Sequence, residues 1–173
     1  MKLKVCGLSK PYEVETCVSL QVDYCGFILN YTKSHRHISF EKAKNLTRII
    51  KSKSKFVGVL FKPSKEELDQ FSSLDFDYYQ LYGDYDSEEL FQIKKKYQKK
   101  IISSIQVKKK DDINRYKSIE SASDIILWDS SGFEESLSWN YDWLKPVSTN
   151  VEKMIAGNIT IDKIKGLKGL TDT

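Results

Sequence analysis

The sequence lacks the features that mark membrane, secreted and metal-binding proteins. Its longest apolar runs, such as residues 56–61, are far too short to span a bilayer, and its N-terminus lacks the basic-then-apolar layout of a signal peptide. Its three cysteines, Cys6, Cys17 and Cys25, are an odd number without zinc-ligand spacing. These absences predict a soluble, cytoplasmic protein with free thiols, and no disulfide, metal site or membrane partner.

No polar tract or linker indicates a disordered tail or a second domain. The 173 residues are 40% hydrophobic and 30% charged, a globular composition whose length suits one domain. The net charge is +4, and lysines cluster at residues 94–100 and 108–110. These clusters carry no interleaved series of aromatic stacking platforms and have acidic residues nearby, so we expect solvated helix faces and no nucleic-acid partner. A mild positive charge also suits a small anionic substrate.

Short β-branched or aromatic runs alternate with longer amphipathic stretches, a pattern typical of parallel strands covered by helices. The seven expected strands are residues 3–6, 24–29, 56–61, 76–81, 101–105, 125–128 and 153–155. The seven expected helices are residues 11–20, 40–51, 65–74, 87–97, 111–119, 142–145 and 161–166. The sequence therefore predicts an α/β protein, either a TIM-type barrel or an open doubly wound sheet.

The expected helices begin with suitable residues. Ser39 precedes one of them, and Ser64 is followed three residues later by Glu67, which is the spacing of a capping box. Within residues 40–51, one apolar stripe is expected to face the sheet. Its members are Ala43, Leu46, Ile49 and Ile50.

In either architecture, ligands bind at the carboxyl ends of the strands, where the N-termini of the following helices favour anions. Two groups that can exchange protons stand at such positions, Cys6 and Asp129. A thiol becomes a base near neutrality when cations or helix N-termini stabilise its thiolate, and a carboxyl group becomes an acid there when it is desolvated. Such a pair suits isomerisation by proton transfer. The alternative roles are a small buried apolar residue for Cys6 and a capping or salt-bridged carboxylate for Asp129.

Six segments in collinear order resemble motifs of the phosphoribosylanthranilate isomerases. They are KVCGLSKP at residues 4–11, VDYCGFIL with SHRHIS at residues 22–29 and 34–39, FVGVLF at residues 56–61, YYQLYGD at residues 78–84 and ILWDSS at residues 126–131. The first segment resembles the family's K-[IV]-C-G-[IL] opening, and SHRHIS resembles its S-x-R-x-[IV]-S. The resemblance runs over nearly the whole chain.

This resemblance implies a TIM-type barrel and an Amadori rearrangement of N-(5-phosphoribosyl)anthranilate in tryptophan biosynthesis, without a cofactor. It implies that Cys6 is the general base, that Asp129 is the general acid and that Arg36 holds the substrate carboxylate. The other expected substrate contacts are Gly7, Gln80, Tyr82, Gly157 and Asn158, and Gly157 is expected to present backbone N–H groups to the phosphate. His35 and His37 are expected to be surface neighbours of Arg36.

The chain departs from the family pattern at two of these places. Tyr82 stands where the family has histidine, which puts a substrate contact in doubt. The family's glycine-rich loop after the acid is replaced by residues 135–141, although Asp142 and Trp143 keep its Asp-Trp pair. Because glycine permits close backbone approach to a phosphate or sugar, this change should weaken or reshape substrate binding.

The third departure is that the family continues into an eighth strand and a final helix, whereas this sequence stops at Thr173. We therefore expect residues 1–173 to form one barrel domain with seven of its eight units, incomplete at the C-terminus. The first and last strands would then have unpaired edges that favour self-association, and part of the phosphate site would be missing.

The sequence leaves two other functions open. One is an inactive truncated barrel that acts as a scaffold or pairs with another chain. The other is a related barrel isomerase with a different phosphosugar substrate. Arg36 argues against the second, because a carboxylate partner is specific to anthranilate-like substrates.

Overall fold

The computed structural model describes residues 1–130 and 137–173, and each predicted strand has a counterpart in it. The strands are β1 (Lys4–Cys6), β2 (Tyr24–Ile28), β3 (Lys55–Phe61), β4 (Tyr78–Tyr82), β5 (Lys100–Gln106), β6 (Ile125–Asp129) and β7 (Glu152–Ile155). The α-helices are α1 (Pro11–Ser19), α2 (Phe40–Leu46), α3 (Lys65–Phe71), α4 (Ser87–Tyr97) and α5 (Ile161–Leu167). Three segments are 3₁₀-helices: η1 (Lys110–Ser118), η2 (Glu120–Ala122) and η3 (Tyr141–Leu144).

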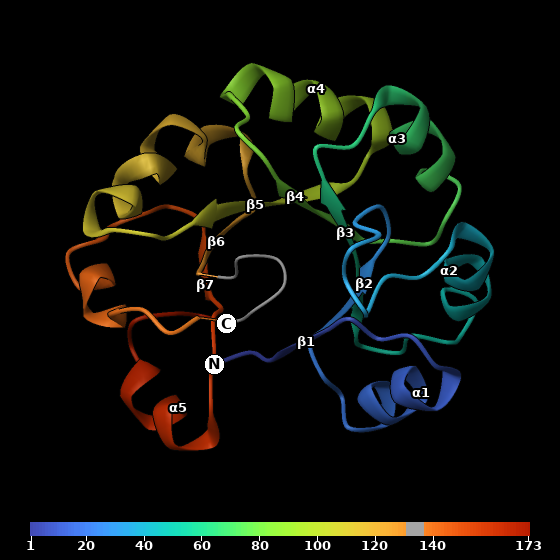
Figure 1. Ribbon diagram of the computed structural model, residues 1–173, viewed down its shortest axis with the longest axis horizontal. Coiled ribbons are helices and arrows are strands. Elements are labelled where there is room, and N and C mark those ends of the chain that lie inside the picture. Colours follow the sequence, from blue (N-terminus) through green and yellow to red (C-terminus); the bar gives the residue numbers. More distant parts are fainter. Residues whose placement is uncertain (131–136) are drawn as a thin grey trace.

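The strands form one parallel sheet in the order β1-β2-β3-β4-β5-β6-β7. The sheet curves around a central axis, and the helices surround it on the outside (Figure 1). A doubly wound sheet would reverse its strand order at a switch point, whereas this order runs in one direction throughout. The structure therefore selects the TIM-type barrel from the two architectures that the sequence left open.

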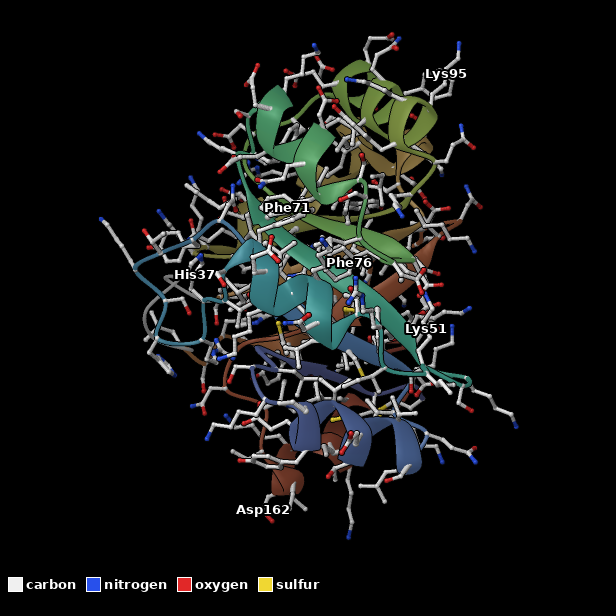
Figure 2. The ribbon with its side chains drawn as sticks, turned by 90° about the vertical axis from the view of Figure 1, so that its right-hand side faces the viewer. His37, Lys51, Phe71, Phe76, Lys95 and Asp162 are labelled. Carbon is white, nitrogen blue, oxygen red and sulfur yellow. The ribbon has the colours of Figure 1, made fainter. Side chains whose placement is uncertain are left out.

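Two apolar layers hold the barrel together. The inner layer lies inside the strands and includes Tyr78, Ile102 and Leu127. The outer layer lies between the strands and the helices. Figure 2 shows Phe71 of α3 and Phe76 in this layer, while Lys95 of α4 points into solvent. This alternation of inward and outward side chains is what positions polar groups inside the barrel mouth.

Two predicted helix starts are confirmed. Ser39 accepts a hydrogen bond from the Lys42 backbone N–H (3.3 Å), and Ser64 and Glu67 form a reciprocal capping box. The predicted stripe is wrong at its end, because α2 stops at Leu46 and the side chain of Ile50 is 85% exposed. Ala43 and Leu46 are buried as predicted.

The segment expected as a helix at residues 111–119 is a 3₁₀-helix instead. Its buried residues are Ile113, Tyr116 and Ile119, at intervals of three. This interval fits the three residues per turn of a 3₁₀-helix, whereas an α-helix has 3.6. Residues 142–145, also expected as a helix, fall on the short 3₁₀-helix η3.

The prediction that β1 and β7 have bare edges is partly wrong, because residues 171–173 lie between them. The backbone N–H groups of Asp172 and Thr173 donate to Lys153 O at 2.9 and 3.0 Å, and that of Ile155 donates to Thr173 O at 3.1 Å. On the other side, Lys2 N donates to Asp172 O at 2.7 Å. Figure 1 shows the two chain ends side by side at this point.

The terminal residues are thus hydrogen-bonded to β7 on one side and to Lys2, just before β1, on the other. Self-association through open edges and an incomplete domain over residues 1–173 both stay predictions. Among the helices of residues 1–130 and 137–173, none has the length and apolarity needed to cross a bilayer.

Candidate active site

A cavity of about 650 Å³ opens at the carboxyl ends of the strands and extends toward the space between β1 and β7. Seven of the predicted site residues line it: Cys6, Arg36, Gln80, Tyr82, Asp129, Gly157 and Asn158. The eighth, Gly7, lies beneath the side chain of Arg36. Segments far apart in the sequence thus meet around one space, as expected for the ligand-binding end of a barrel.

Cys6 is the last residue of β1, and Gly26 lies beside it on β2. A Cβ atom added at Gly26 would lie 3.0 Å from both the Cys6 Sγ and the Lys4 Nζ atoms. The ammonium and the sulfur are therefore separated by no more than twice that distance. A cation in this position attracts a thiolate. Our sequence analysis missed Lys4, although strand alternation places residues 4 and 6 on the same face.

The other two cysteines face away from this cavity. Cys17 and Cys25 are buried in the outer layer, and all three cysteines are free thiols. Burial raises the pKa of the Cys17 thiol, and burial raises the pKa of Cys25 to about 12. Both are therefore protonated at neutral pH. Cys6 is the cysteine that lines the cavity.

Asp129 ends β6, and its side chain is 5% exposed. The Tyr82 hydroxyl donates to its Oδ2 atom at 2.6 Å, and the Gln80 Nε2 atom donates to the Tyr82 hydroxyl at 3.0 Å. The Asp129 backbone carbonyl accepts from Val107 N at 2.8 Å, which fixes the strand end. A carboxyl group so enclosed is well placed to exchange a proton with a ligand in the cavity.

Arg36 lies over the end of β1. Its Nη1 atom donates to the Cys6 carbonyl at 3.1 Å, and its backbone N–H donates to Ser34 Oγ at 3.2 Å. The neighbouring His35 is exposed, while His37 is half-buried with its Nε2 atom 3.1 Å from Leu29 O. The Arg36 guanidinium thus lies at the cavity rim, in contact with the backbone of Cys6.

Replacing Gly7 with alanine is expected to displace Arg36. The added Cβ would lie 2.5 Å from Arg36 Cδ, and Gly7 has a φ of +86°, which other residues rarely adopt. We expect KM to rise about tenfold, because the variant displaces Arg36, which the sequence predicts to hold the substrate carboxylate. We also expect the variant to lose about 1 kcal/mol of stability from backbone strain.

Gly169→Ala is the matched control for this variant. Gly169 has a φ of +90°, but an added Cβ would meet nothing within 4 Å. Thermal melts should therefore show a loss of stability in both variants, and steady-state kinetics should show a raised KM in Gly7→Ala alone. If the two variants had the same KM, Gly7 would not be needed to position the Arg36 side chain.

The loop after β7, which includes Ala156 and Gly157, is hydrogen-bonded to side chains of residues 137–141. Trp139 Nε1 donates to Ala156 O at 2.9 Å, and the Tyr141 hydroxyl donates to Gly157 O at 2.6 Å. Gly157 has a φ of +105°, and a Cβ there would lie 2.3 Å from Ser130 Oγ. Side chains of residues 139 and 141, in the segment expected to replace a glycine-rich loop, therefore hold the loop after β7 in place. Ser131, Glu135 and Ser136, which the motif analysis named, lie outside the described residues.

A second lysine near the cavity is Lys163, which lies on α5. Lys163 Nζ donates to Asn158 O and Ser138 Oγ, both at 2.9 Å, and Asn158 Nδ2 donates to the same hydroxyl at 2.9 Å. Our sequence analysis missed Lys163, because no motif marks it and the loop contact is long-range. Its ammonium adds positive charge beside Gly157 and Asn158.

The curved parallel sheet and the polar side chains at its carboxyl ends define the chain as a (βα)-barrel protein of the TIM type. The sequence model of N-(5'phosphoribosyl)anthranilate (PRA) isomerase matches residues 3–171. The chain belongs to the phosphoribosylanthranilate isomerase family. The predicted family and fold class are therefore confirmed.

Two relatives illustrate the similarity in sequence. The N-(5'-phosphoribosyl)anthranilate isomerase of Streptococcus mutans is 32% identical over 169 residues, which are 95% of this chain and 80% of the relative. That of Streptococcus gordonii is 33% identical over 141 residues, which are 80% of this chain and 67% of the relative.

Two solved structures illustrate the similarity in fold. The phosphoribosyl anthranilate isomerase of Thermotoga maritima superposes with a TM-score of 0.84 at 22% identity, covering 99% of this chain and 83% of that one. A structure of a phosphoribosyl anthranilate isomerase in complex with reduced 1-(o-carboxyphenylamino)-1-deoxyribulose 5-phosphate gives a TM-score of 0.79 at 21% identity, covering 99% of this chain and 82% of that one. At such identities the likeness shows the fold alone.

Proposed function

We propose that this chain catalyses the Amadori rearrangement of N-(5-phosphoribosyl)anthranilate to 1-(2-carboxyphenylamino)-1-deoxyribulose 5-phosphate in tryptophan biosynthesis, with Asp129 as acid and Cys6 as base. The observation that carries this assignment is that both side chains line the same 650 Å³ cavity, together with Arg36. Membership of the isomerase family supports the reaction.

Asp129 acts first. Its carboxyl group protonates the oxygen of the ribose ring, and the C1–O bond breaks as the anilino nitrogen lone pair forms a C1=N double bond. The product of this step is an open-chain Schiff-base cation and an Asp129 carboxylate. Because Asp129 is almost fully buried, little water competes with the sugar for its proton.

Cys6 acts second. Its thiolate removes the proton from C2, and the electron pair of the C2–H bond moves toward the cationic nitrogen to give the enolamine. The Lys4 ammonium lies on the same face of β1 and supports the thiolate before this transfer. The enolamine tautomerises to the ketone product, and proton exchange with solvent restores the acid form of Asp129 and the thiolate of Cys6.

The anthranilate carboxylate is assigned to Arg36. A guanidinium keeps its charge at all relevant pH values and binds a carboxylate through two parallel hydrogen bonds. The Arg36 Nη1 contact with the Cys6 carbonyl brings the two assigned groups to one end of the cavity, so that a carboxylate held there places the sugar near the thiol.

Arg36→Ala is expected to raise KM roughly tenfold to hundredfold, because it removes charge-assisted hydrogen bonds to the substrate. The value of kcat should change less, since this contact is made before and during the reaction alike. His35→Ala is the control, because His35 is the exposed neighbour in the same segment. Steady-state kinetics that show no change in Arg36→Ala would favour a different phosphosugar substrate.

The phosphate is assigned to the loop after β7. Gly157 has a φ of 105°, and a glycine permits the close approach of the backbone to an anion. The Lys163 ammonium contacts the Asn158 carbonyl and adds positive charge on the same side. The hydrogen bonds from Trp139 and Tyr141 hold the carbonyl groups of this loop and so fix its conformation.

Product analysis tests the reaction directly. The purified chain is incubated with N-(5-phosphoribosyl)anthranilate, and the products are separated by chromatography beside authentic 1-(2-carboxyphenylamino)-1-deoxyribulose 5-phosphate. Enzyme-dependent formation of this isomer supports the proposal. Persistence of the substrate, in a chain with a cooperative thermal melt, would favour the scaffold function.

A further inference from the structure

We propose that Tyr82 is a positioning residue for Asp129, and that its phenol fixes which carboxyl oxygen carries the transferable proton. This inference rests on the proposed function and deepens it at the acid. The sequence predicted a substrate contact for Tyr82. The hydrogen bond from its hydroxyl to Asp129 Oδ2, at 2.6 Å, gives it a role that acts through the acid.

The position of Tyr82 explains how it reaches Asp129. Tyr82 is the last residue of β4, and Asp129 is the last residue of β6, so β5 lies between them. Neighbouring strands are separated by about 4.8 Å, so the two backbones are roughly 10 Å apart. A tyrosine with an aspartate spans this gap, whereas a histidine ring ends well short of a phenol hydroxyl.

The intervening strand leaves room for the phenol. Ser104 of β5 pairs with Tyr82 on one side and with Leu127 on the other. Its Oγ atom is buried and has no hydrogen-bond partner in the described structure. The small side chain of Ser104 leaves space for the Tyr82 ring to cross β5. Large and small residues are expected to alternate in this way inside a barrel.

The direction of the hydrogen bonds is set by the groups at both ends. The Gln80 Nε2 atom can only donate, and it donates to the Tyr82 oxygen at 3.0 Å. The Tyr82 hydroxyl therefore gives its own hydrogen to Asp129 Oδ2. Gln80 is 2% exposed, so water rarely replaces it in this series.

This direction has a chemical consequence for Asp129. When Asp129 is protonated, its Oδ2 atom accepts the phenol hydrogen bond as the carbonyl oxygen, and the proton is held on Oδ1. When Asp129 has donated that proton, the same hydrogen bond stabilises the carboxylate that remains. Tyr82 thus orients the acid and stabilises the carboxylate that proton transfer leaves behind.

Tyr82→Phe tests the proposal, because it removes the hydroxyl and keeps the ring. We expect kcat to fall about tenfold, as when one hydrogen bond to a charged group is lost, with KM unchanged. We also expect the basic limb of the kcat against pH profile to move to higher pH by about one unit, because the carboxylate has lost a stabilising donor. Gln80→Met should move this limb in the same direction by less.

Tyr78→Phe is the matched control. Tyr78 is also on β4 and also faces the inner layer, but it contacts the Tyr24 ring at 5.6 Å, at the other end of the strand. We expect wild-type kinetics from this variant. An active wild-type chain whose Tyr82→Phe variant keeps kcat and the pH profile, or has a raised KM alone, would overturn the proposal and leave the isomerase function in place.

A spectroscopic measurement decides the matter even if the chain proves inactive. At a pH high enough to ionise Asp129, a hydroxyl proton held at 2.6 Å by its buried carboxylate should give a low-field proton resonance that exchanges slowly with water. This resonance should be absent in Tyr82→Phe and should move upfield in Asp129→Asn, where the acceptor is no longer charged. An unchanged resonance in Asp129→Asn would overturn the contact itself, whatever the activity of the chain.

Discussion

Cys6→Ser is expected to reduce kcat about a thousandfold, within the range that a positioned general base contributes. A serine hydroxyl stays protonated throughout the neutral range, so it cannot take the C2 proton as a thiolate does. The replacement is nearly isosteric and lies at a strand end that lines the cavity, so the fold and KM should be little affected. The loss would therefore appear in the chemical step.

Cys17→Ala serves as the control for this result. Cys17 is a buried thiol of α1 in the outer layer, and burial raises its pKa, so it remains protonated at neutral pH. Its replacement should cost stability and leave kcat near the wild-type value. A Cys6→Ser variant with wild-type kcat would mean that another group removes the proton.

Asp129→Asn is expected to reduce kcat by a similar factor, about a thousandfold. Asparagine keeps the shape of aspartate, and its carbonyl oxygen can still accept the hydrogen bond of Tyr82, but it has no proton to give to the ring oxygen. The variant should therefore fold and bind substrate while ring opening fails. Steady-state kinetics should show a lowered kcat with KM nearly unchanged.

The matched control for this second variant is Asp142→Asn. Asp142 is an exposed residue of η3 that pairs with Lys145 on the surface. The Asp142→Asn variant changes charge and shape in the same way as Asp129→Asn does. We expect it to have wild-type kinetics. Equal kcat values in the two aspartate variants would show that Asp129 is not the acid.

The sequence predicted the order of the seven βα units because each depends on a local signal. A strand is a short apolar run, and a helix start is a residue such as Ser64 with Glu67 three positions later. The site residues followed from the same frame, since Cys6 and Asp129 end their strands. The collinear motifs then supplied the chemistry that periodicity alone could not.

The errors arose where local signals were weak or were overridden. The three-residue spacing of Ile113 and Tyr116 was present in the sequence, but it was read as an α-helix instead of a 3₁₀-helix. Residues 171–173 are too few to carry a strand pattern, and their hydrogen bonds to Lys153 and Lys2 are long-range contacts that no periodicity reveals.

The proposed role of Tyr82 did not follow from the sequence for a related reason. The strand was predicted over residues 76–81, which placed Tyr82 after its end, and the family resemblance implied a substrate contact for it. In the structure β4 runs through Tyr82, and the alternation of side chains along a strand turns Tyr78, Gln80 and Tyr82 to the same inner face. A shift of one residue at the strand end therefore changes the proposed partner from the substrate to Asp129.

The loss of phosphoribosylanthranilate fluorescence with time is the measurement that tests the account most directly. The purified 173-residue chain is compared with Cys6→Ser and Asp129→Asn under identical conditions. The account predicts that the wild-type chain removes the fluorescence catalytically and that each variant does so about a thousandfold more slowly. A folded wild-type chain that leaves the fluorescence unchanged, or variants as fast as the wild type, would contradict it.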